Sequence, residues 1–181
     1  KVDVILIGGG MANTFLKADG YEIGKSLVEL DKIEIAKELL KRARSNHTKV
    51  VLPVDLAVVK KIDEDAKRKE IPLNKIDKNE IILDIGQATI ELFKKEISKA
   101  QTVFWNGTLG MTELPDFEFG SKSIAYILAE SNALRVVGGG DTAGALNKFG
   151  LSDAMTHVST GGGASLEFLE GKQLPGIEVL E

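Results

Sequence analysis

Cysteine is absent from the 181-residue chain, and tryptophan occurs only once. Without thiols there is no disulfide framework and no thiolate metal site, which suits a reducing compartment, so we expect a cytoplasmic protein. No apolar run approaches the roughly 20 residues of a membrane span, and no signal-peptide pattern opens the chain. The 23 basic and 27 acidic residues give a net charge of −4. We therefore expect neither a membrane nor a nucleic acid as a partner.

Strand-like and helix-like segments alternate along the chain, and no linker divides it. Residues 60–79 are dense in charge and are interpreted as a solvated helix or loop, with the basic stretches 41–44 and 67–69 as solvated faces. Alternation of this kind predicts one α/β domain over residues 1–181, a three-layer Rossmann-like doubly wound parallel sheet of about five to six strands. The predicted strands cover residues 2–7, 49–54, 80–84, 102–105, 134–137 and 155–158, and the predicted helices cover residues 11–17, 32–44, 89–98, 120–131, 142–149 and 164–169.

Glycine is the abundant residue, and nine of the 19 glycines form three GGG triplets at residues 8–10, 138–140 and 161–163. Each triplet lies between a predicted strand and a predicted helix. In doubly wound sheets, ligands bind at the edge formed by the carboxyl ends of the parallel strands, where these triplets lie. Glycine lets the backbone approach a ligand closely, and the following helix offers free N–H groups to an anion. For a single triplet, a tight strand-to-helix turn is as good an explanation as a ligand, but three together favour a phosphate-bearing ligand.

Two familiar nucleotide motifs do not fit. Residues 20–26 (GYEIGKS) have three residues between the glycines where a P-loop has four, and they follow a helix. Residues 138–143 (GGGDTA) match the dinucleotide fingerprint, but no acidic residue follows about 20 positions later. Asp141, at the predicted helix start, is either an N-cap or a carboxylate near a nucleotide-bound magnesium, and the two roles are compatible.

A longer set of motifs, taken in order, resembles the C-terminal, nucleotide-binding domain of the phosphoglycerate kinase family. These motifs span nearly the whole chain, and the last is the most specific. They are IGGGMANTFL (7–16), LPVD (52–55), LDIG (83–86), WNGTLG (105–110), VVGGGDTA (136–143) and HVSTGGGASLEFLEGKQLPG (157–176).

The resemblance implies reversible phosphoryl transfer between ATP and 3-phosphoglycerate in glycolysis, by an enzyme that is usually monomeric. In that family the C-terminal domain holds magnesium and ATP or ADP, and the N-terminal domain holds the phosphoglycerate. The chain opens on Lys1 directly before a predicted strand, so we expect a fragment. It would lack the N-terminal domain and a central strand with a phosphate-binding lysine, and it would not turn over alone.

The resemblance also implies roles for individual residues. Gly9, Gly10 and Leu83 correspond to the adenine pocket, Asn106 and Gly107 to the segment that reaches the phosphates, and Glu113 to the carboxylate on the ribose. Gly139, Gly140, Asp141 and Thr142 correspond to the phosphate and magnesium loop, with Asp141 facing the metal. Thr160, Gly161, Gly162 and Gly163 correspond to the catalytic helix start that receives the migrating phosphoryl group.

Two positions depart from the family pattern. Thr108 stands where the family usually has proline, which makes the loop less rigid, and Ile82 stands where glycine or alanine is common, which narrows the adenine pocket. Two other functions remain as alternatives: a nucleotide-binding module without catalysis, and a Rossmann-type dehydrogenase, against which the missing ribose-binding acid argues.

Overall fold

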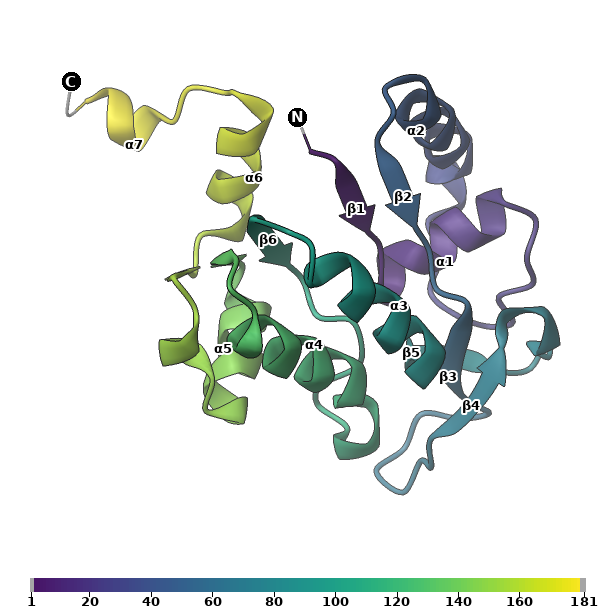
Figure 1. The fold of residues 1–181 in the computed structure, drawn as a ribbon. Coiled ribbons are helices and arrows are strands. Elements are labelled where there is room, and N and C mark those ends of the chain that lie inside the picture. The colour runs from purple at the N-terminus through teal and green to yellow at the C-terminus, as the bar shows by residue number, and fades with distance from the viewer. Residues whose placement is uncertain (1, 180–181) are drawn as a thin grey trace.

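The computed structural model describes residues 2–179, in which strands and helices alternate along most of the chain (Figure 1). In chain order, with η marking 3₁₀ turns, the elements are β1 (Val4–Leu6), α1 (Gly9–Ala18), η1 (Leu30–Lys32), α2 (Ile33–Ser45), β2 (Lys49–Val51), β3 (Asp55–Val59), β4 (Lys69–Pro72), η2 (Leu73–Lys75), β5 (Ile81–Ile85), α3 (Gln87–Ile97), β6 (Thr102–Asn106), η3 (Pro115–Phe117), α4 (Phe119–Glu130), β7 (Leu134–Gly138), α5 (Gly140–Phe149), η4 (Ser152–Ala154), β8 (His157–Ser159), α6 (Gly162–Glu170) and α7 (Pro175–Glu178).

Parallel strands form two sheets, which confirms the predicted α/β class. Strand β1 pairs with β2, and β7 lies between β6 and β8. Among the described residues β1 and β6 are not hydrogen-bonded to each other, so the parallel strands form two sheets instead of one continuous sheet. The carboxyl ends of β1, β7 and β8 lead into the three glycine triplets, as predicted, and β6 leads into a turn that contains Gly107 and Gly110.

A third sheet, which is antiparallel, was not predicted. Strand β3 lies between β4 and β5 and pairs with both in antiparallel register. The interpretation of residues 60–79 as a helix or loop is therefore wrong for β4, whose Ile71 is buried against β3. The ion pair between Lys69 of β4 and Glu80, directly before β5, at 2.7 Å, links the two outer strands of this sheet.

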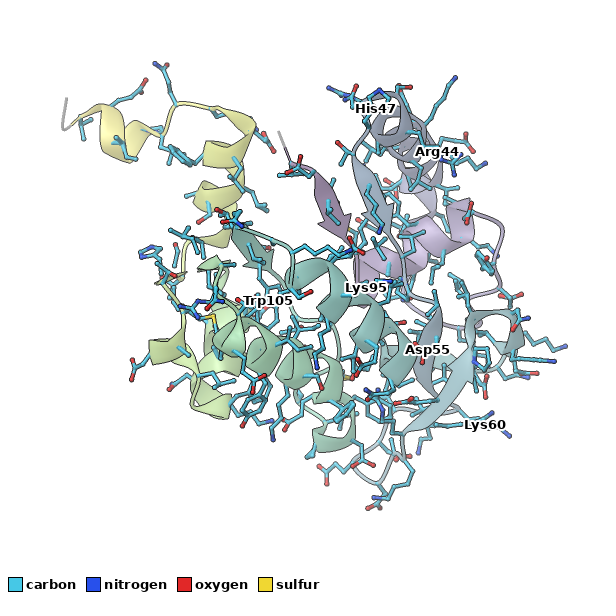
Figure 2. All side chains as sticks on the ribbon, in the orientation of Figure 1. Arg44, His47, Asp55, Lys60, Lys95 and Trp105 are labelled. Atoms are coloured by element: carbon cyan, nitrogen blue, oxygen red, sulfur yellow. The ribbon has the colours of Figure 1, made fainter. Side chains whose placement is uncertain are left out.

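The largest hydrophobic core lies between α3, α4 and the β6–β7–β8 sheet. Phe93 of α3, Leu128 of α4 and Val137 of β7 are almost fully buried in it. Trp105, the single tryptophan, is 8% exposed and belongs to the same cluster (Figure 2). Because α3 also packs against β3, this helix joins the antiparallel sheet to the parallel one.

Helices α6 and α7 extend from the rest of the fold at the end where β1 also lies (Figure 1). Within them no residue is buried, and Phe168 of α6 and Ile177 of α7 are among the exposed apolar side chains. Within residues 2–179, no helix has the length and apolar content that a membrane crossing requires.

The carboxylate of Asp55, at the start of β3, caps the N-terminus of α3 from outside the helix. It accepts hydrogen bonds from the backbone N–H groups of Ala88, at 2.8 Å, and Thr89, at 2.7 Å. The Thr89 hydroxyl also donates to it, at 2.5 Å. These bonds satisfy donors that have no partner within a helix and place a negative charge at its positive end. Asp55 therefore fixes α3 to the antiparallel sheet.

A second carboxylate, Asp84 of β5, is fully buried and is held by Arg68. The guanidinium Nη1 donates to Asp84 Oδ2 at 2.7 Å, and the Gly120 N–H at the start of α4 donates to the same oxygen at 2.8 Å. The interpretation of residues 67–69 as a solvated face is wrong for Arg68, whose side chain is only 14% exposed. Residues 41–44 do match it, and Arg44 lies at the outer end of α2 (Figure 2).

Burial raises the pKa of Asp84 to about 6, although the hydrogen bonds from Gly120 and Arg68 oppose the increase. In the unfolded chain an aspartate titrates near pH 4. Between these two values the folded chain holds a proton that the unfolded chain has released. The free energy of unfolding contributed by this group therefore increases as the pH falls through that window.

Replacing Asp55 by alanine tests the cap on α3. The substitution leaves the helix N–H donors without their acceptor, so the free energy of unfolding should fall by about 1–2 kcal/mol. Urea denaturation followed by circular dichroism measures this change. Asp65→Ala, at an exposed position, is the matched control and should change stability by less than about 0.5 kcal/mol. Equal effects of the two substitutions would contradict the capping role.

Asp84→Asn tests the buried carboxylate, because asparagine keeps the shape and cannot titrate. The free energy of unfolding of the unchanged chain, minus that of Asp84→Asn, should increase as the pH is lowered from 7 to 4. Denaturant titrations at several pH values measure the difference. A constant difference, or one that decreases on acidification, would mean that the ion pair with Arg68 outweighs burial and that the pKa of Asp84 is not raised.

Candidate functional site

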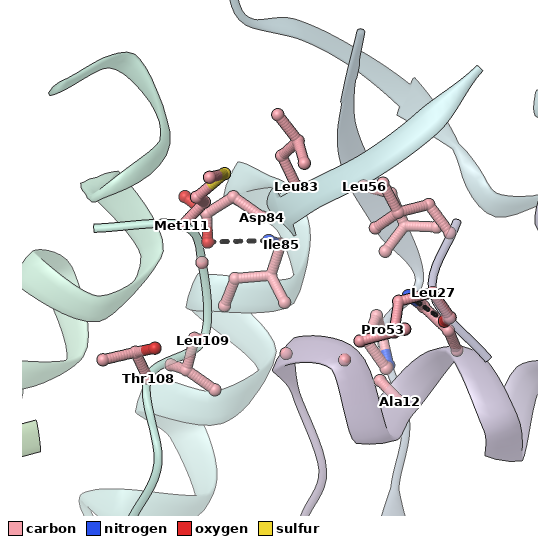
Figure 3. Close-up of a pocket in the computed structure, with 15 residues that line it drawn as sticks. Ala12, Leu27, Pro53, Leu56, Leu83, Asp84, Ile85, Thr108, Leu109 and Met111 are labelled. Atoms are coloured by element: carbon pink, nitrogen blue, oxygen red, sulfur yellow. Dashed lines mark hydrogen bonds between the residues drawn. The ribbon is translucent and has the colours of Figure 1, made fainter. Parts of the chain in front are cut away.

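A cavity of about 230 Å³ opens between the start of α1 and the end of β5. In Figure 3, Ala12, Leu27 and Pro53 lie on one side and Thr108, Leu109 and Met111 on the other, with Leu83 and Asp84 of β5 between them. Most of the lining is apolar. The lining residues are Gly9, Gly10, Ala12, Asn13, Leu27, Pro53, Leu56, Ile82, Leu83, Asp84, Ile85, Thr108, Leu109, Gly110 and Met111.

Gly9, Gly10 and Leu83, the three residues assigned to an adenine pocket, all line this cavity. Gly9 has a φ of +62°, a conformation that favours glycine, and a Cβ atom there would lie 2.6 Å from the carbonyl oxygen of Thr108. The glycine therefore lets the start of α1 approach the 108–111 segment closely. The apolar slot that results suits a flat ring.

Both positions that depart from the family pattern, Ile82 and Thr108, also line the cavity. Its volume is below the roughly 300–1,000 Å³ of pockets that enclose a whole drug-sized ligand. The cavity therefore suits one ring system and not an entire nucleotide. The rest of such a ligand would extend beyond it.

Leu27 and Asn13 are cavity residues that the sequence patterns did not reveal. The Asn13 side chain is buried on α1, and its Nδ2 donates to the backbone carbonyl of Leu27 at 3.0 Å. This bond brings the loop after α1 back over the cavity. Leu27 lies in a loop without periodicity, so only the Asn13 contact, which joins residues 14 positions apart, reveals its place.

The loops after β6, β7 and β8 meet beside the cavity. The Gly107 N–H donates to the Thr142 hydroxyl at 2.8 Å, and the Gly139 N–H donates to the Ser159 carbonyl at 2.9 Å. A Cβ atom on Gly162 would lie 2.7 Å from the Gly139 Cα. Glycine is therefore required where these loops touch. Predicted site residues from three separate segments are thus brought together.

Helices α5 and α6 begin at this meeting point, so the positive ends of two helix dipoles lie at one edge of the sheet. The N-cap residues are Gly139 and Gly161, neither of which has a capping side chain. The first N–H groups of both helices are therefore available to an anion. At the start of α5, Gly140 faces open space, because nothing lies within 4 Å of the place that a Cβ atom would occupy.

Asp141 lies in the first turn of α5 and is not its N-cap, a position that Gly139 occupies. Its side chain is exposed. Asp141 therefore does not cap α5, which was one of its two predicted roles. Within residues 2–179 no cluster of three or more histidine or carboxylate side chains could hold a metal unaided. A metal at Asp141 would need oxygen ligands from a bound phosphate and water, which is a common arrangement for magnesium.

The other predicted residues lie at the edges of the site. Thr160 and Gly161 are exposed between β8 and α6, and Gly163 is exposed in the first turn of α6. Glu113 is exposed on the loop between Met111 and η3 and does not line the cavity. Its assignment to a ribose therefore stays a prediction.

One segment joins the cavity to the glycine loops. Asn106 ends β6, and its side-chain nitrogen lies close to Gly138, Gly139 and Gly162. Thr108 and Leu109, only two and three residues later, line the cavity. Three residues span at most about 11 Å, so the two halves of the site are within reach of one extended ligand.

Comparison with known proteins gives one consistent result. The family model for phosphoglycerate kinase matches residues 1–172. The phosphoglycerate kinase of Dictyoglomus turgidum is 54% identical over 182 residues, and that of Pelotomaculum thermopropionicum is 52% identical over 180 residues. The matches cover 100% and 99% of this chain, and 46% of each relative. The chain thus spans about half the length of the curated relatives it matches.

Solved structures agree with these matches. The phosphoglycerate kinase of Coxiella burnetii superimposes with a TM-score of 0.95 at 46% identity, covering 99% of this chain and 46% of that one. The enzyme of Pyrococcus horikoshii OT3 gives a TM-score of 0.86 at 33% identity, over 99% of this chain and 45% of that one. With the family model matching nearly its whole length, this chain belongs to the phosphoglycerate kinase family.

Proposed function

We propose that this chain is the nucleotide-binding half of a kinase that transfers a phosphoryl group between ATP and 3-phosphoglycerate in glycolysis. The observation that carries the proposal is the short segment 106–109, which joins an apolar cavity to two helix starts. An adenine ring fits the first, and a chain of phosphates fits the second. Family membership supplies the identity of the reaction.

The cavity end would bind the base. Leu83 and Leu27 present apolar surface from different parts of the lining, and Gly9 and Gly10 let backbone approach the ring. The ribose would leave the cavity past Met111 toward Glu113. The phosphates would then follow Asn106 and Gly107 to the loop formed by Gly139, Gly140, Asp141 and Thr142.

Magnesium is the cofactor that we propose for the nucleotide, with Asp141 as the protein ligand. The residues present fit this ion, since an exposed carboxylate stands beside helix N–H groups that would hold phosphate oxygens. Magnesium commonly binds through one or two carboxylates and substrate phosphates. When bound, it would neutralise charge on the phosphate oxygens.

Phosphoryl transfer needs positioning and charge stabilisation more than covalent chemistry from the protein. We propose that the N–H groups from Thr160 to Gly163, just before and at the start of α6, donate to the equatorial oxygens of the migrating group; the Gly161 N–H, which donates to the Ser159 hydroxyl at 3.2 Å, would be shared with it. Donors fixed at a helix start need little reorganisation during the reaction. Thr160, Gly161, Gly162 and Gly163 would therefore act through their backbone and not through side chains.

The acceptor 3-phosphoglycerate would be held by the other half of a protein twice this length, because the relatives are about that long. We infer that the chain alone binds nucleotide without turnover. We further infer a monomeric, cytoplasmic enzyme with no nucleic-acid or membrane partner.

Calorimetric titration of the purified chain with Mg-ADP tests the proposal. We expect saturable binding and, in a coupled assay with ATP and 3-phosphoglycerate, no turnover. Absence of binding at millimolar Mg-ADP would contradict the nucleotide-binding role. Turnover at a rate near that of a full-length relative would contradict the inference that 3-phosphoglycerate is held by another half of the protein. Binding of NADH in preference to ADP would favour the dehydrogenase alternative.

Asp141→Asn separates the metal from the nucleotide. The amide keeps the size of the side chain but loses the charge, so affinity for ADP should fall about tenfold with magnesium present and stay nearly unchanged in EDTA. Titrations in both buffers measure the two affinities. Asp153→Asn, in η4 away from the loop, is the matched control. Equal losses with and without magnesium would show that Asp141 does not serve the metal.

A further inference from the structure

Arg68 stands apart from the other residues of its charged loop, because its guanidinium is buried against four segments of the fold. Nε donates to Glu70 at 2.8 Å, and Nη2 donates to the Ile85 carbonyl at 2.6 Å. Nη1 donates to Asp84 at 2.7 Å and to the Asp116 carbonyl at 3.3 Å. The guanidinium also lies over the Phe119 ring, 5.0 Å from its centre.

Two of these partners, Asp84 and Ile85, line the cavity, whereas Arg68 itself does not. Arginine is suited to this task because its planar fork donates in fixed directions to several acceptors at once. The contact with the Asp116 carbonyl and the Phe119 ring joins the same guanidinium to η3 and α4. Arg68 therefore connects the end of β5 to the two elements that follow the cavity loop.

The Asp84 carboxylate transmits this constraint to the cavity wall. A Cβ atom on either Gly110 or Gly120 would overlap it, so the carboxylate fills a slot between two glycines. Gly110 also lines the cavity, and the adjacent Met111 N–H donates to the Leu83 carbonyl at 2.9 Å. A shift of Asp84 would therefore displace both β5 and the 108–111 segment, which form adjacent parts of the cavity wall.

We propose that Arg68 is a positioning residue for the base-binding end of the nucleotide site, acting through Asp84 and Ile85 on the cavity wall. The inference rests on the proposed function and adds to it a residue that touches no part of the nucleotide. The glycine loops lie on the other side of Asn106 and share no hydrogen bond with Arg68. Its effect should therefore be confined to the base.

Two probes separate the ends of the site: Mg-ADP, which has a base, and magnesium tripolyphosphate, which has none. For Arg68→Met we expect the affinity for Mg-ADP to fall about tenfold and the affinity for tripolyphosphate to stay within about twofold. Lys67→Met removes the same charge from the preceding residue, whose side chain is 85% exposed, and should change neither affinity. Calorimetry measures binding, and circular dichroism confirms that each variant is folded.

Three outcomes would overturn the proposal. In a folded Arg68→Met chain these are an unchanged affinity for Mg-ADP, an equal loss for both probes, and recovery of Mg-ADP affinity in the double variant Arg68→Met/Asp84→Asn. Recovery would mean that Arg68 only neutralises Asp84, because the double variant restores charge balance without restoring the contact to Ile85.

A second variant covers the case in which Arg68→Met does not fold. Arg68→Lys keeps the charge beside Asp84 but has no fork to reach the Ile85 carbonyl, so the same selective loss for Mg-ADP is expected, and its absence would overturn the proposal. Failure of the unchanged chain to bind either probe would instead contradict the proposed function itself. The two failures are therefore distinguishable.

Discussion

The site depends on backbone segments that approach one another more closely than a Cβ atom permits. Gly9 brings the start of α1 against Thr108, and Gly162 brings the start of α6 against Gly139. At both contacts the neighbour is main chain, which cannot rotate away as a side chain can. The first approach forms one wall of the cavity, and the second brings two helix starts together. The geometry of this edge therefore follows from where side chains are missing.

The sequence predicted this edge well because its signals are local. A short β-branched run followed by a glycine triplet and a helix is visible without knowledge of the fold. The triplets do lie at strand-to-helix junctions, but Gly9 and Gly162 are the first residues of α1 and α6, whereas the sequence placed them in the turns before those helices. Strand β4 was missed because only Ile71 of its four residues is buried, which leaves no period to detect. Its pairing with β3 gives it a structure that its own sequence does not indicate.

Arg68 and Leu27 were missed for a related reason. Arg68 stands in a run of lysine and glutamate and has no local feature that separates it from its neighbours. It is buried because β4 places it beside Asp84, 16 residues later. Leu27 reaches the cavity through Asn13, 14 residues earlier. Contacts of this kind depend on tertiary structure, so pattern and composition do not reveal them.

The two ends of the site are therefore formed by different groups, backbone N–H groups at one end and mainly side chains at the other. This difference determines where amino-acid substitutions can occur. At the proposed phosphate end, hydrogen bonds from the Gly107 and Gly139 N–H groups hold the loops, and the first N–H groups of α5 and α6 remain as donors. Such an end tolerates few substitutions, because any side chain on Gly162 would separate the loops. The proposed base end is lined mainly by side chains, and the Arg68–Asp84 ion pair holds one part of its wall from outside the cavity. Residue changes at positions 82 and 108 alter the shape of the cavity without affecting the backbone N–H donors of α5 and α6. We therefore expect differences in base preference among related chains to arise at the cavity, while the phosphate end stays the same.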